Sequence, residues 1–324
     1  MTRRRFLQIT AVSGSLLLGG NVWRLMQRRA HTISQTRTLM GTIINLVLVS
    51  ESADKGEAAA AATFDEMARL IAFFDHRRAD SPLAELNRVR WLDAPPPELV
   101  ELLSLGVAYG RLTGGAFDIS VKPVVDAWRD GEMDVAAKQR LVDFRRIEIG
   151  SEQVRLQPGM ALTLDGIAKG RGVDGATAVL QAHGFTNVLV EAGGDLVGLG
   201  HRADGDAWHV GIQHPRQQTS GEMLGVLPVS MSAVATSGDY RYRFSEDGAQ
   251  HHIIDPHTGS SPLELASVTV MAPTAADADA LSTAVMVMGV DAGLALINRL
   301  PHVEALLVTK TMQLHYSRGF PELT

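Results

Sequence analysis

Hydrophobic positions along this chain follow two different periods, which predicts interspersed strands and helices. Residues 39–49 alternate in polarity, with Ile44, Leu46 and Leu48 on one side, as expected of a strand that buries one face. Residues 55–73 are rich in alanine and carry larger apolar side chains at helical spacing, which indicates an amphipathic helix. The N-terminal part of the domain should therefore pair a strand with a helix.

Turn and capping residues mark the remaining elements. The proline run at 95–97 opens a helix through Tyr109, residues 167–183 form another, and Thr274 begins a third that Gly289 ends. One more helix and two strands complete the chain. Further strands are predicted at 145–149, 153–156, 161–164, 187–191, 207–213, 224–230, 241–245, 251–254 and 266–271.

The order of these elements predicts an α+β fold with mixed, largely antiparallel sheets and flanking helices. Strands and helices are interspersed without a regular strand–helix–strand repeat, which argues against a parallel sheet. A chain of 324 residues with 45% hydrophobic and 20% charged residues can bury a sizeable core. We therefore assign residues 31–324 to one folded domain.

Charge is distributed unevenly between the N-terminus and this domain. Residues 1–29 contain six arginines and no acidic residue, which leaves 24 of the 30 basic residues against all 36 acidic ones. The rest of the chain therefore carries a net charge of −12. A domain this acidic is a poor candidate for binding the phosphate backbone of nucleic acids, so we expect no nucleic-acid partner.

The N-terminus resembles a twin-arginine export signal. It reads TRRRFLQ over residues 2–8 and continues into an apolar run at 9–22, and only Gln8 departs from the pattern. We expect residues 1–30 to direct the chain out of the cytoplasm, to the periplasm or another extracytoplasmic compartment. Because no Ala-x-Ala site follows, an uncleaved tether in the inner membrane is an alternative, and a plain basic anchor is another.

Three groups of residues could carry chemistry. The glycine-rich segment 165–175 lies where a strand becomes a helix, and backbone amides there can bind an anion, although such a segment is often an ordinary turn. Asp279 and Thr283 share one face of a predicted helix and supply the hard oxygen ligands that Mg²⁺ prefers, but a solvated aspartate beside a core threonine has the same spacing. His252 and Asp255 enter a tight turn, where His252 could act as a base or serve only structurally.

Several other site types are excluded or lack their usual signature. The chain has no cysteine, which excludes disulfides, thiolate metal ligands and cysteine nucleophiles. The histidines lack the helical spacing of a zinc site, and no Gly-x-Ser-x-Gly elbow of a serine hydrolase occurs. Residues 236–238 (TSG) are predicted to form a loop that could offer hydroxyl groups to a ligand.

Eight short motifs occur in one order along the chain, and in that order they are similar to the ApbE family of FAD:protein FMN transferases. The resemblance covers about residues 36–316 and includes the three groups described above. The motifs are residues 40–42 (MGT), 80–81 (DS) with Asn87, 115–118 (GAFD), 166–170 (GIAKG) with Asp174, 193–195 (GGD), 236–238 (TSG), 252–256 (HIIDP) with 258–259 (TG), and 279–283 (DALST).

The resemblance implies a site for FAD and Mg²⁺ in a flavin cleft between two subdomains. Mg²⁺ would be held by the side chains of Asp279 and Thr283, with backbone oxygens near Gly166 and Ser282. The residues implied as FAD contacts are Met40, Ala116, Phe117, Asp118, Lys169, His252 and Ile253, together with Arg77 and Thr163 at two positions that depart from the family pattern.

The reaction implied by the resemblance is attack of a threonine or serine hydroxyl of another protein on the FMN phosphorus of FAD, with release of AMP. His252 is the first candidate for the base, with Asp255 or Asp174 as its orienting partner. The acceptor is expected to be a flavoprotein of a membrane-linked electron-transfer system. Two alternatives remain, namely an exported FAD carrier without chemistry and an FAD pyrophosphatase that yields FMN and AMP.

Four positions depart from the family pattern within the implied flavin site. Thr163 replaces an aspartate, Asp165 a glycine, Arg171 an aromatic residue and Arg77 a tyrosine that often packs on the flavin. A guanidinium can also stack on an isoalloxazine ring, and a threonine can still form a hydrogen bond. These departures leave the predicted metal ligands and the HIIDP motif unchanged.

Overall fold

The computed structural model describes residues 31–39, 41–217 and 220–324. The predicted export signal at 1–30 and the predicted FAD contact Met40 lie outside the described residues.

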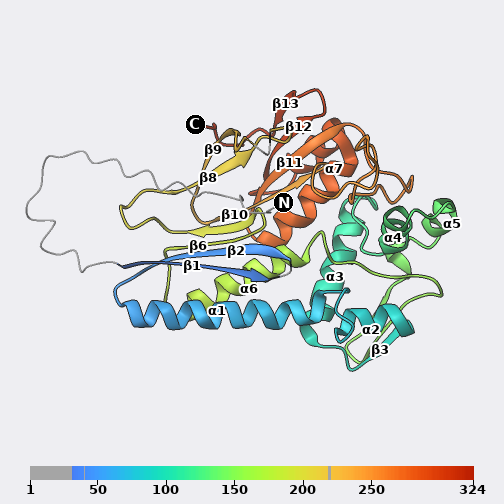
Figure 1. Cartoon of the computed structure of the whole chain (residues 1–324), viewed down its shortest axis with the longest axis horizontal. Helices are drawn as coiled ribbons and strands as arrows, with labels where there is room; N and C mark the ends of the chain where they lie inside the picture. Colours follow the sequence, from blue (N-terminus) through green and yellow to red (C-terminus); the bar gives the residue numbers. More distant parts are fainter. Residues whose placement is uncertain (1–30, 40, 218–219) are drawn as a thin grey trace, which may run out of the picture.

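A single large antiparallel sheet forms the centre of the molecule (Figure 1). Every neighbouring pair of its strands is antiparallel, which confirms the predicted α+β class. In spatial order its eight strands are β1 (His31–Leu39), β2 (Thr42–Ser50), β6 (Val188–Ala192), β7 (Asp195–Leu199), β10 (Ser232–Gly238), β11 (Leu265–Ala272), β12 (Glu304–Thr309) and β13 (Leu314–Tyr316).

Both faces of this sheet are buried over its central strands. Val188 and Val190 of β6 face a core shared with the long helices, whereas Leu189 between them faces a second cluster on the other side. That second cluster includes Trp208 of the hairpin formed by β8 (Trp208–Gln213) and β9 (Met223–Val229). Strands buried on both faces lack a hydrophobic–polar alternation, which is why residues 188–190 are three consecutive apolar side chains.

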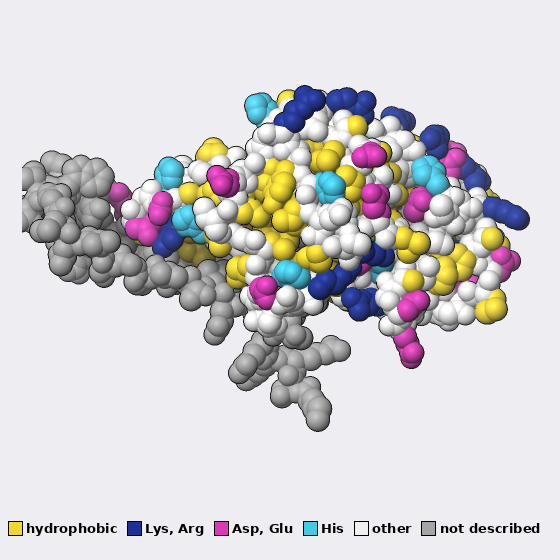
Figure 2. Space-filling model, turned by 90° about the horizontal axis from the view of Figure 1, so that it is seen from above, with side chains coloured by type: hydrophobic (Ala, Val, Ile, Leu, Met, Phe, Trp, Pro, Cys, Tyr) yellow, Lys and Arg dark blue, Asp and Glu magenta, His cyan; other side chains and the backbone are white. Residues whose placement is uncertain are grey.

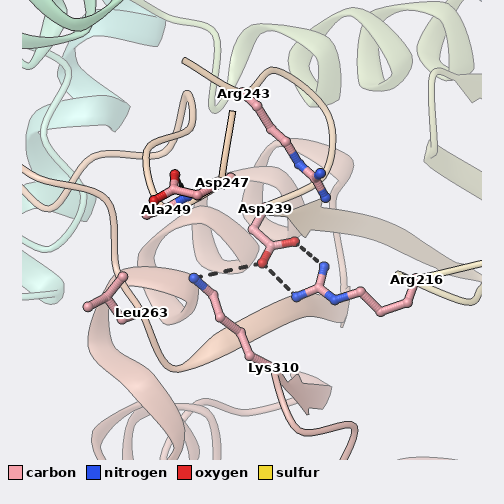
Figure 3. Close-up of a pocket in the computed structure, with 8 residues that line it drawn as sticks. Arg216, Asp239, Arg243, Asp247, Ala249, Leu263 and Lys310 are labelled. Atoms are coloured by element: carbon pink, nitrogen blue, oxygen red, sulfur yellow. Dashed lines mark hydrogen bonds and ion pairs between the residues drawn. The ribbon is translucent and has the colours of Figure 1, made fainter. Parts of the chain in front are cut away.

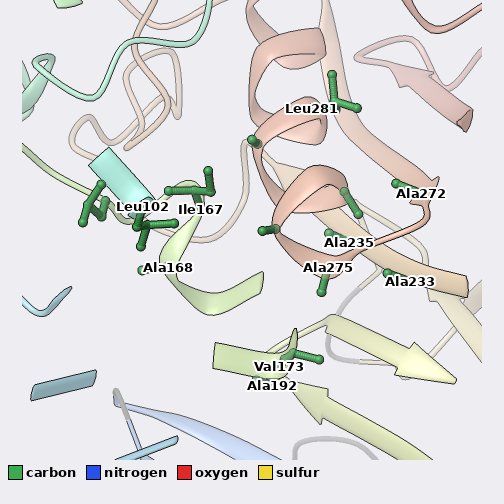
Figure 4. Close-up of a cluster of buried hydrophobic side chains, with 14 of the residues drawn as sticks. Leu102, Ile167, Ala168, Val173, Ala192, Ala233, Ala235, Ala272, Ala275 and Leu281 are labelled. Carbon is green, nitrogen blue, oxygen red and sulfur yellow. The ribbon is translucent and has the colours of Figure 1, made fainter. Parts of the chain in front are cut away.

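Three long helices cover one face of the sheet: α1 (Ala53–Phe74), α6 (Ala168–Ala182) and α7 (Ala275–Ile297). Figure 4 shows the start of α6, at Ile167 and Ala168, beside Leu102 of α3 (Pro97–Leu112), with Ala275 and Leu281 of α7 nearby. All five side chains are buried in the same core. The N-terminal ends of α6 and α7 therefore meet inside the protein.

A smaller helical part lies at one end of the molecule (Figure 1). Beside α3 it contains α2 (Pro82–Val89), α4 (Lys122–Asp130), α5 (Val135–Gln139), the short 3₁₀ helix Phe144–Arg146, and a small sheet of β3 (Trp91–Asp93), β4 (Glu148–Ile149) and β5 (Gln153–Arg155). The main-chain amide of Thr163 donates to the carbonyl of Ile119 at 2.8 Å, which ties this part to the segment leading into α6.

The structure corrects several predicted elements. Residues 161–164, 241–245 and 251–254 form no strand of a sheet, because their polar groups are bonded in turns, to side chains or in a single bridge between Arg243 and His251. The predicted loop 236–238 is the end of β10. Strand β1 was not predicted, because it is an edge strand in which Ile33 is the buried position and which therefore shows little hydrophobic alternation.

Helix α7 is interrupted at Gly289, where the sequence predicts its end. This glycine has φ 78° and ψ −172°, which are not helical, and a second helical segment, the predicted further helix, then runs on to Ile297. By length and composition α7 could cross a membrane, but 61% of its apolar window is buried within the protein. Its hydrophobicity therefore fits the core helix of a globular domain.

The close approach of α6 and α7 predicts that Gly170→Ala is strongly destabilising. A Cβ atom at Gly170 would lie 2.2 Å from the carbonyl oxygen of Ala275, and backbone atoms cannot rotate away as a side chain can. We expect a loss of about 2 kcal/mol or more in the free energy of unfolding, measured by urea denaturation. Gly172→Ala is the matched control, because its Cβ would meet only Met67 at 4.0 Å and should stabilise α6 by about 0.5–1 kcal/mol. Equal effects of the two changes would contradict this packing.

Candidate functional site

Two carboxylates join the N-terminal ends of α6 and α7 reciprocally. Asp174 of α6 accepts hydrogen bonds from the amides of Ala275 at 2.7 Å and Ala276 at 2.9 Å, which are among the free donors that begin α7. Asp279 of α7 accepts in return from the amide of Gly170 at 3.1 Å. The relative position of the two helix ends is therefore fixed by three hydrogen bonds between residues far apart in the sequence.

Oxygen atoms from three elements converge at this junction. The Thr283 hydroxyl lies 3.2 Å from the position that a Cβ of Gly166 would occupy, so the Gly166 turn faces α7 directly. From β10, the Ser237 hydroxyl lies 2.8 Å from that of Ser282 and 3.2 Å from that of Thr283. Asp279 is 3% exposed and lies one helical turn before Thr283. All four residues predicted as metal ligands are thus brought together.

A half-buried lysine, with its side chain 30% exposed, lies between two carboxylates at the same place. Lys169 bonds to Asp195, and its ammonium group lies 3.6 Å from Asp279. Burial lowers the pKa of Lys169, but the two carboxylates outweigh it and hold this pKa well above its usual range. Burial and the charge of Asp195 raise the pKa of Asp279 to about 8. Asp195 was not predicted as a site residue, although the GGD motif contains it.

The donor set at the junction fits Mg²⁺ better than a softer metal. It consists of oxygen atoms from one carboxylate, hydroxyl groups and the backbone, which are the ligands of a hard cation that keeps some of its waters. Among the described residues, no three histidine or acidic side chains gather as they would in a metal site made of protein ligands alone. A cation here would also relieve the repulsion between Asp279 and Asp195.

His252 lies beside this junction in an environment that keeps its imidazole neutral. Its ring packs edge to face on Tyr242, with ring centroids 5.5 Å apart, and its Nδ1 atom is buried without a hydrogen-bond partner among the described residues. Burial, and next the nearby His251, lower the pKa of His252 to about 4. An unprotonated imidazole with a free nitrogen can accept a proton at neutral pH. The neighbouring Ile253, a predicted FAD contact, is 5% exposed.

Neither predicted orienting partner of His252 bonds to it among the described residues. Asp174 is committed to the amides of α7, and the carboxylate of Asp255 accepts from the amide of His257 at 2.9 Å within its turn. The prediction that one of these aspartates orients His252 is therefore wrong. The carboxylate whose charge does act on His252 is that of Asp165.

His251 predicts a pH effect on stability. It is 0% exposed, its Nε2 atom has no partner in the described structure, and burial lowers its pKa from 6.5 to about 4. The unfolded chain then binds more protons between these two values, so this group should cost about 1.4 kcal/mol of stability per pH unit as the pH falls from 6.5 towards 4.

The measurement is urea unfolding of the wild type and of His251→Gln at pH 7 and pH 5. Because glutamine does not titrate, the variant should lose less stability than the wild type over this interval. His201→Gln, at an exposed position, is the control and should follow the wild type. Parallel losses in His251→Gln and the wild type would contradict the assignment.

Two of the four departures from the family pattern contact each other. The Arg77 guanidinium donates to both oxygens of Asp165, at 2.9 and 2.6 Å, and the imidazole of His76 lies 3.4 Å from the same carboxylate. Burial opposes ionisation of Asp165, but hydrogen bonds from His76 and Arg77 hold its pKa below the usual range. Arg77 is therefore bound to the residue before Gly166 rather than free to stack on a ring.

The loop 116–118 forms a wall of the junction. The Phe117 ring lies 3.1 Å from the Cβ position of Gly166, and its centroid is 6.1 Å from that of Tyr109. The Asp118 carboxylate turns into the protein, where it accepts from Ser120 at 2.7 and 2.8 Å and from the amide of Phe144 at 3.0 Å. Asp118 therefore shapes the loop. Contact of Ala116, Phe117 or Thr163 with FAD stays a prediction.

Comparison with known proteins gives one consistent relationship. The family model described as the ApbE family matches residues 40–307. The chain is 30% identical to an FAD:protein FMN transferase of Vibrio cholerae, over 94% of this chain and 93% of that protein, and 32% identical to one of Treponema pallidum, over 90% and 88%.

Solved structures give the same relationship. The fold is similar to the crystal structure of the ApbE protein from Thermotoga maritima, with a TM-score of 0.81 at 26% identity over 89% of this chain and 97% of that one. It is also similar to the apo form of the flavinyl transferase ApbE from Pseudomonas stutzeri, with a TM-score of 0.79 at 27% identity over 89% and 95%.

Proposed function

The chain belongs to the ApbE family and is an FAD:protein FMN transferase, and from this premise we propose that it joins FMN to a threonine or serine hydroxyl of an acceptor flavoprotein, with Mg²⁺, releasing AMP. The observation that carries the proposal is the convergence of Asp279, Thr283 and the Gly166 turn at the N-terminus of α6. Bound there, Mg²⁺ would offset the charge of the FAD diphosphate and polarise the phosphorus for attack.

The residues around this junction supply the remaining parts of the reaction. Lys169 presents a fixed positive charge next to Asp279, suited to a phosphate oxygen. Neutral His252 takes the proton of the acceptor hydroxyl as that oxygen forms its bond to phosphorus. The bond between the phosphorus and the bridging oxygen breaks, and AMP leaves with the electron pair. Proton transfer of this kind contributes roughly 10²–10⁴-fold to a rate.

The test is transfer of fluorescent flavin to a protein. The purified chain is incubated with FAD, Mg²⁺ and candidate acceptors, and covalent flavin is detected by fluorescence in a denaturing gel, with and without EDTA. A fluorescent acceptor band that needs Mg²⁺ is the expected result. AMP release at full rate without any acceptor would favour an FAD pyrophosphatase, and tight FAD binding without AMP release would favour a carrier.

We also propose that the chain acts outside the cytoplasm, on a flavoprotein of a membrane-linked electron-transfer system. The TRRRFLQ sequence at residues 2–8 supports export by the twin-arginine route. Replacing both Arg3 and Arg4 with lysine should leave the chain in the cytoplasmic fraction of cells that otherwise export it. Unchanged export of the double variant would refute the proposed route.

A further inference from the structure

An open cavity lies beyond the ends of β10 and β12 and is lined mainly by charged side chains (Figure 3). Its volume is about 340 Å³. It is bounded by the segment after β8, the loop after β10, and the residues just before β11 and just after β12. Its lining residues are Arg216, Asp239, Arg243, Asp247, Gly248, Ala249, Leu263 and Lys310.

Both carboxylates of the cavity already have partners. Asp239, which is 4% exposed, accepts two hydrogen bonds from Arg216 at 2.6 and 2.8 Å, and the ammonium group of Lys310 lies 3.9 Å away. Asp247 accepts from the Ser245 hydroxyl at 2.6 Å and from the amide of Ala249 at 2.9 Å. The cavity is therefore lined by three cationic side chains and by two carboxylates that already accept hydrogen bonds.

Arg243 is the cation that these carboxylates leave without a partner. Its guanidinium makes no hydrogen bond or ion pair with any described residue, although it lines the cavity. Its Nε atom lies 3.3 Å from the Cβ position of Gly248, which has φ 70°, so the side chain packs over a glycine turn that has no side chain of its own. A guanidinium held in this way offers its donors to a carboxylate or phosphate.

The cavity opens next to the proposed base. Arg243 pairs with His251 in a β-bridge, and the preceding residue, Tyr242, packs on the ring of His252. Tyr242, next to Arg243 in the sequence, is 68% exposed, and Leu263 on the cavity wall is 67% exposed, so the surface around Arg243 offers accessible apolar side chains. Such a surface suits a protein chain better than a small ligand, which would be enclosed.

Because the rest of the domain is acidic, this cationic cavity favours the binding of an anionic group. Figure 2 shows carboxylates and apolar side chains among the lysines and arginines of the face that it displays. The domain carries 24 basic and 36 acidic residues beyond the N-terminal segment, so its overall field repels an acidic partner. An unpaired guanidinium beside the proposed base would therefore attract an anionic group to this place.

We propose that the Arg243 cavity binds a carboxylate side chain of the acceptor protein, close in sequence to the hydroxyl that receives FMN. This assignment rests on the proposed function, because it takes the partner at His252 to be the acceptor. Arg243 and Lys310 bind the carboxylate, while Tyr242 and Leu263 contact the apolar part of the same segment. The cavity thereby sets the register of the acceptor chain relative to His252.

The experiment compares binding of short labelled peptides that carry one threonine and one glutamate, with the glutamate moved through each position around the threonine. Each peptide has a glutamine counterpart, and binding to the full chain with FAD is followed by fluorescence anisotropy without Mg²⁺. On the wild type, at least one glutamate peptide should bind about tenfold more tightly than its counterpart, as a charged hydrogen bond would give. Arg243→Ala should remove that preference. Arg88→Ala, an exposed arginine on α2, should keep it.

Arg243→Glu with a lysine in place of the favoured glutamate gives an independent check, since reversing both charges should restore tight binding. The assignment is overturned if no glutamate position is favoured, or if Arg243→Ala retains the preference. FAD binding by Arg243→Ala should equal that of the wild type, which excludes a folding defect. If the preference is found but no acceptor is flavinylated in the Mg²⁺ assay, the proposed function fails while the carboxylate site stands.

Discussion

Asp279→Asn is expected to abolish Mg²⁺-dependent flavin transfer and at the same time to raise the melting temperature of the metal-free chain. Loss of the carboxylate removes the one charged ligand among the oxygens that converge at the junction. Metal stabilisation of a phosphoryl-transfer transition state amounts to several kcal/mol, so the rate should fall about a thousandfold or more. The measurement is covalent flavin formed per minute at saturating FAD.

The gain in stability follows from the pKa of Asp279. Burial and the charge of Asp195 raise this pKa from 3.8 to about 8, so ionising the carboxyl costs the folded chain more than the unfolded chain. That cost to the stability of the folded chain grows as the pH rises from 3.8 through 8. Asparagine carries no charge and so removes the cost, while its side-chain carbonyl still accepts a hydrogen bond from the amide of Gly170. In EDTA the melting temperature of the variant should therefore exceed that of the wild type by more at pH 8 than at pH 5.

Thr283→Val is the matched control for these two effects. It removes a predicted ligand without removing a charge, so transfer should fall while the pH dependence of stability stays that of the wild type. Full activity of Asp279→Asn would refute the proposed binding of Mg²⁺ by this residue. An equal stability gain at pH 5 and pH 8 would show instead that Asp279 is ionised freely in the folded chain.

The sequence predicted the elements of the site better than it predicted their contacts. The spacing of Asp279 and Thr283 on one helix face and the position of Gly166 before a helix follow from local periodicity, which repeats along the chain. The reciprocal bonds of Asp174 and Asp279 join residues about a hundred positions apart. No local pattern carries such a contact, since it depends on how α6 and α7 pack.

The prediction of an orienting partner for His252 was wrong for the same reason, since local sequence does not show which groups contact each other in the fold. Asp255 lies three residues away in the sequence, and its closeness suggested an orienting role, but a tight turn directs its carboxylate to the amide of His257. The substitutions at Arg77 and Asp165 were considered separately, and Arg77 was expected to stack on the flavin ring. The bidentate ion pair between them shows that the two changes fit one another, and such a contact depends on the folded structure.

His252→Ala is expected to slow flavin transfer by about 10²–10⁴-fold while FAD still binds. The imidazole contributes proton transfer in the proposed reaction, whereas the diphosphate is held at the junction of α6 and α7. His257→Ala, an exposed residue in the adjoining turn, is the matched control and should retain most of the activity. Transfer rates with a protein acceptor and FAD affinity by fluorescence quenching are measured on the same preparations.

The pH profile distinguishes a base from a residue that only packs. A base must be unprotonated, and the pKa of His252 is lowered from 6.5 to about 4 by burial and by the neighbouring His251, so transfer should stay at its plateau down to about pH 5 and fall to half near pH 4. The residual activity of His252→Ala should lack this acid limb, because the group that titrates is gone. A half-point near 6.5 in the wild type would indicate an exposed histidine as the base. An unchanged limb in His252→Ala would assign the proton to another group.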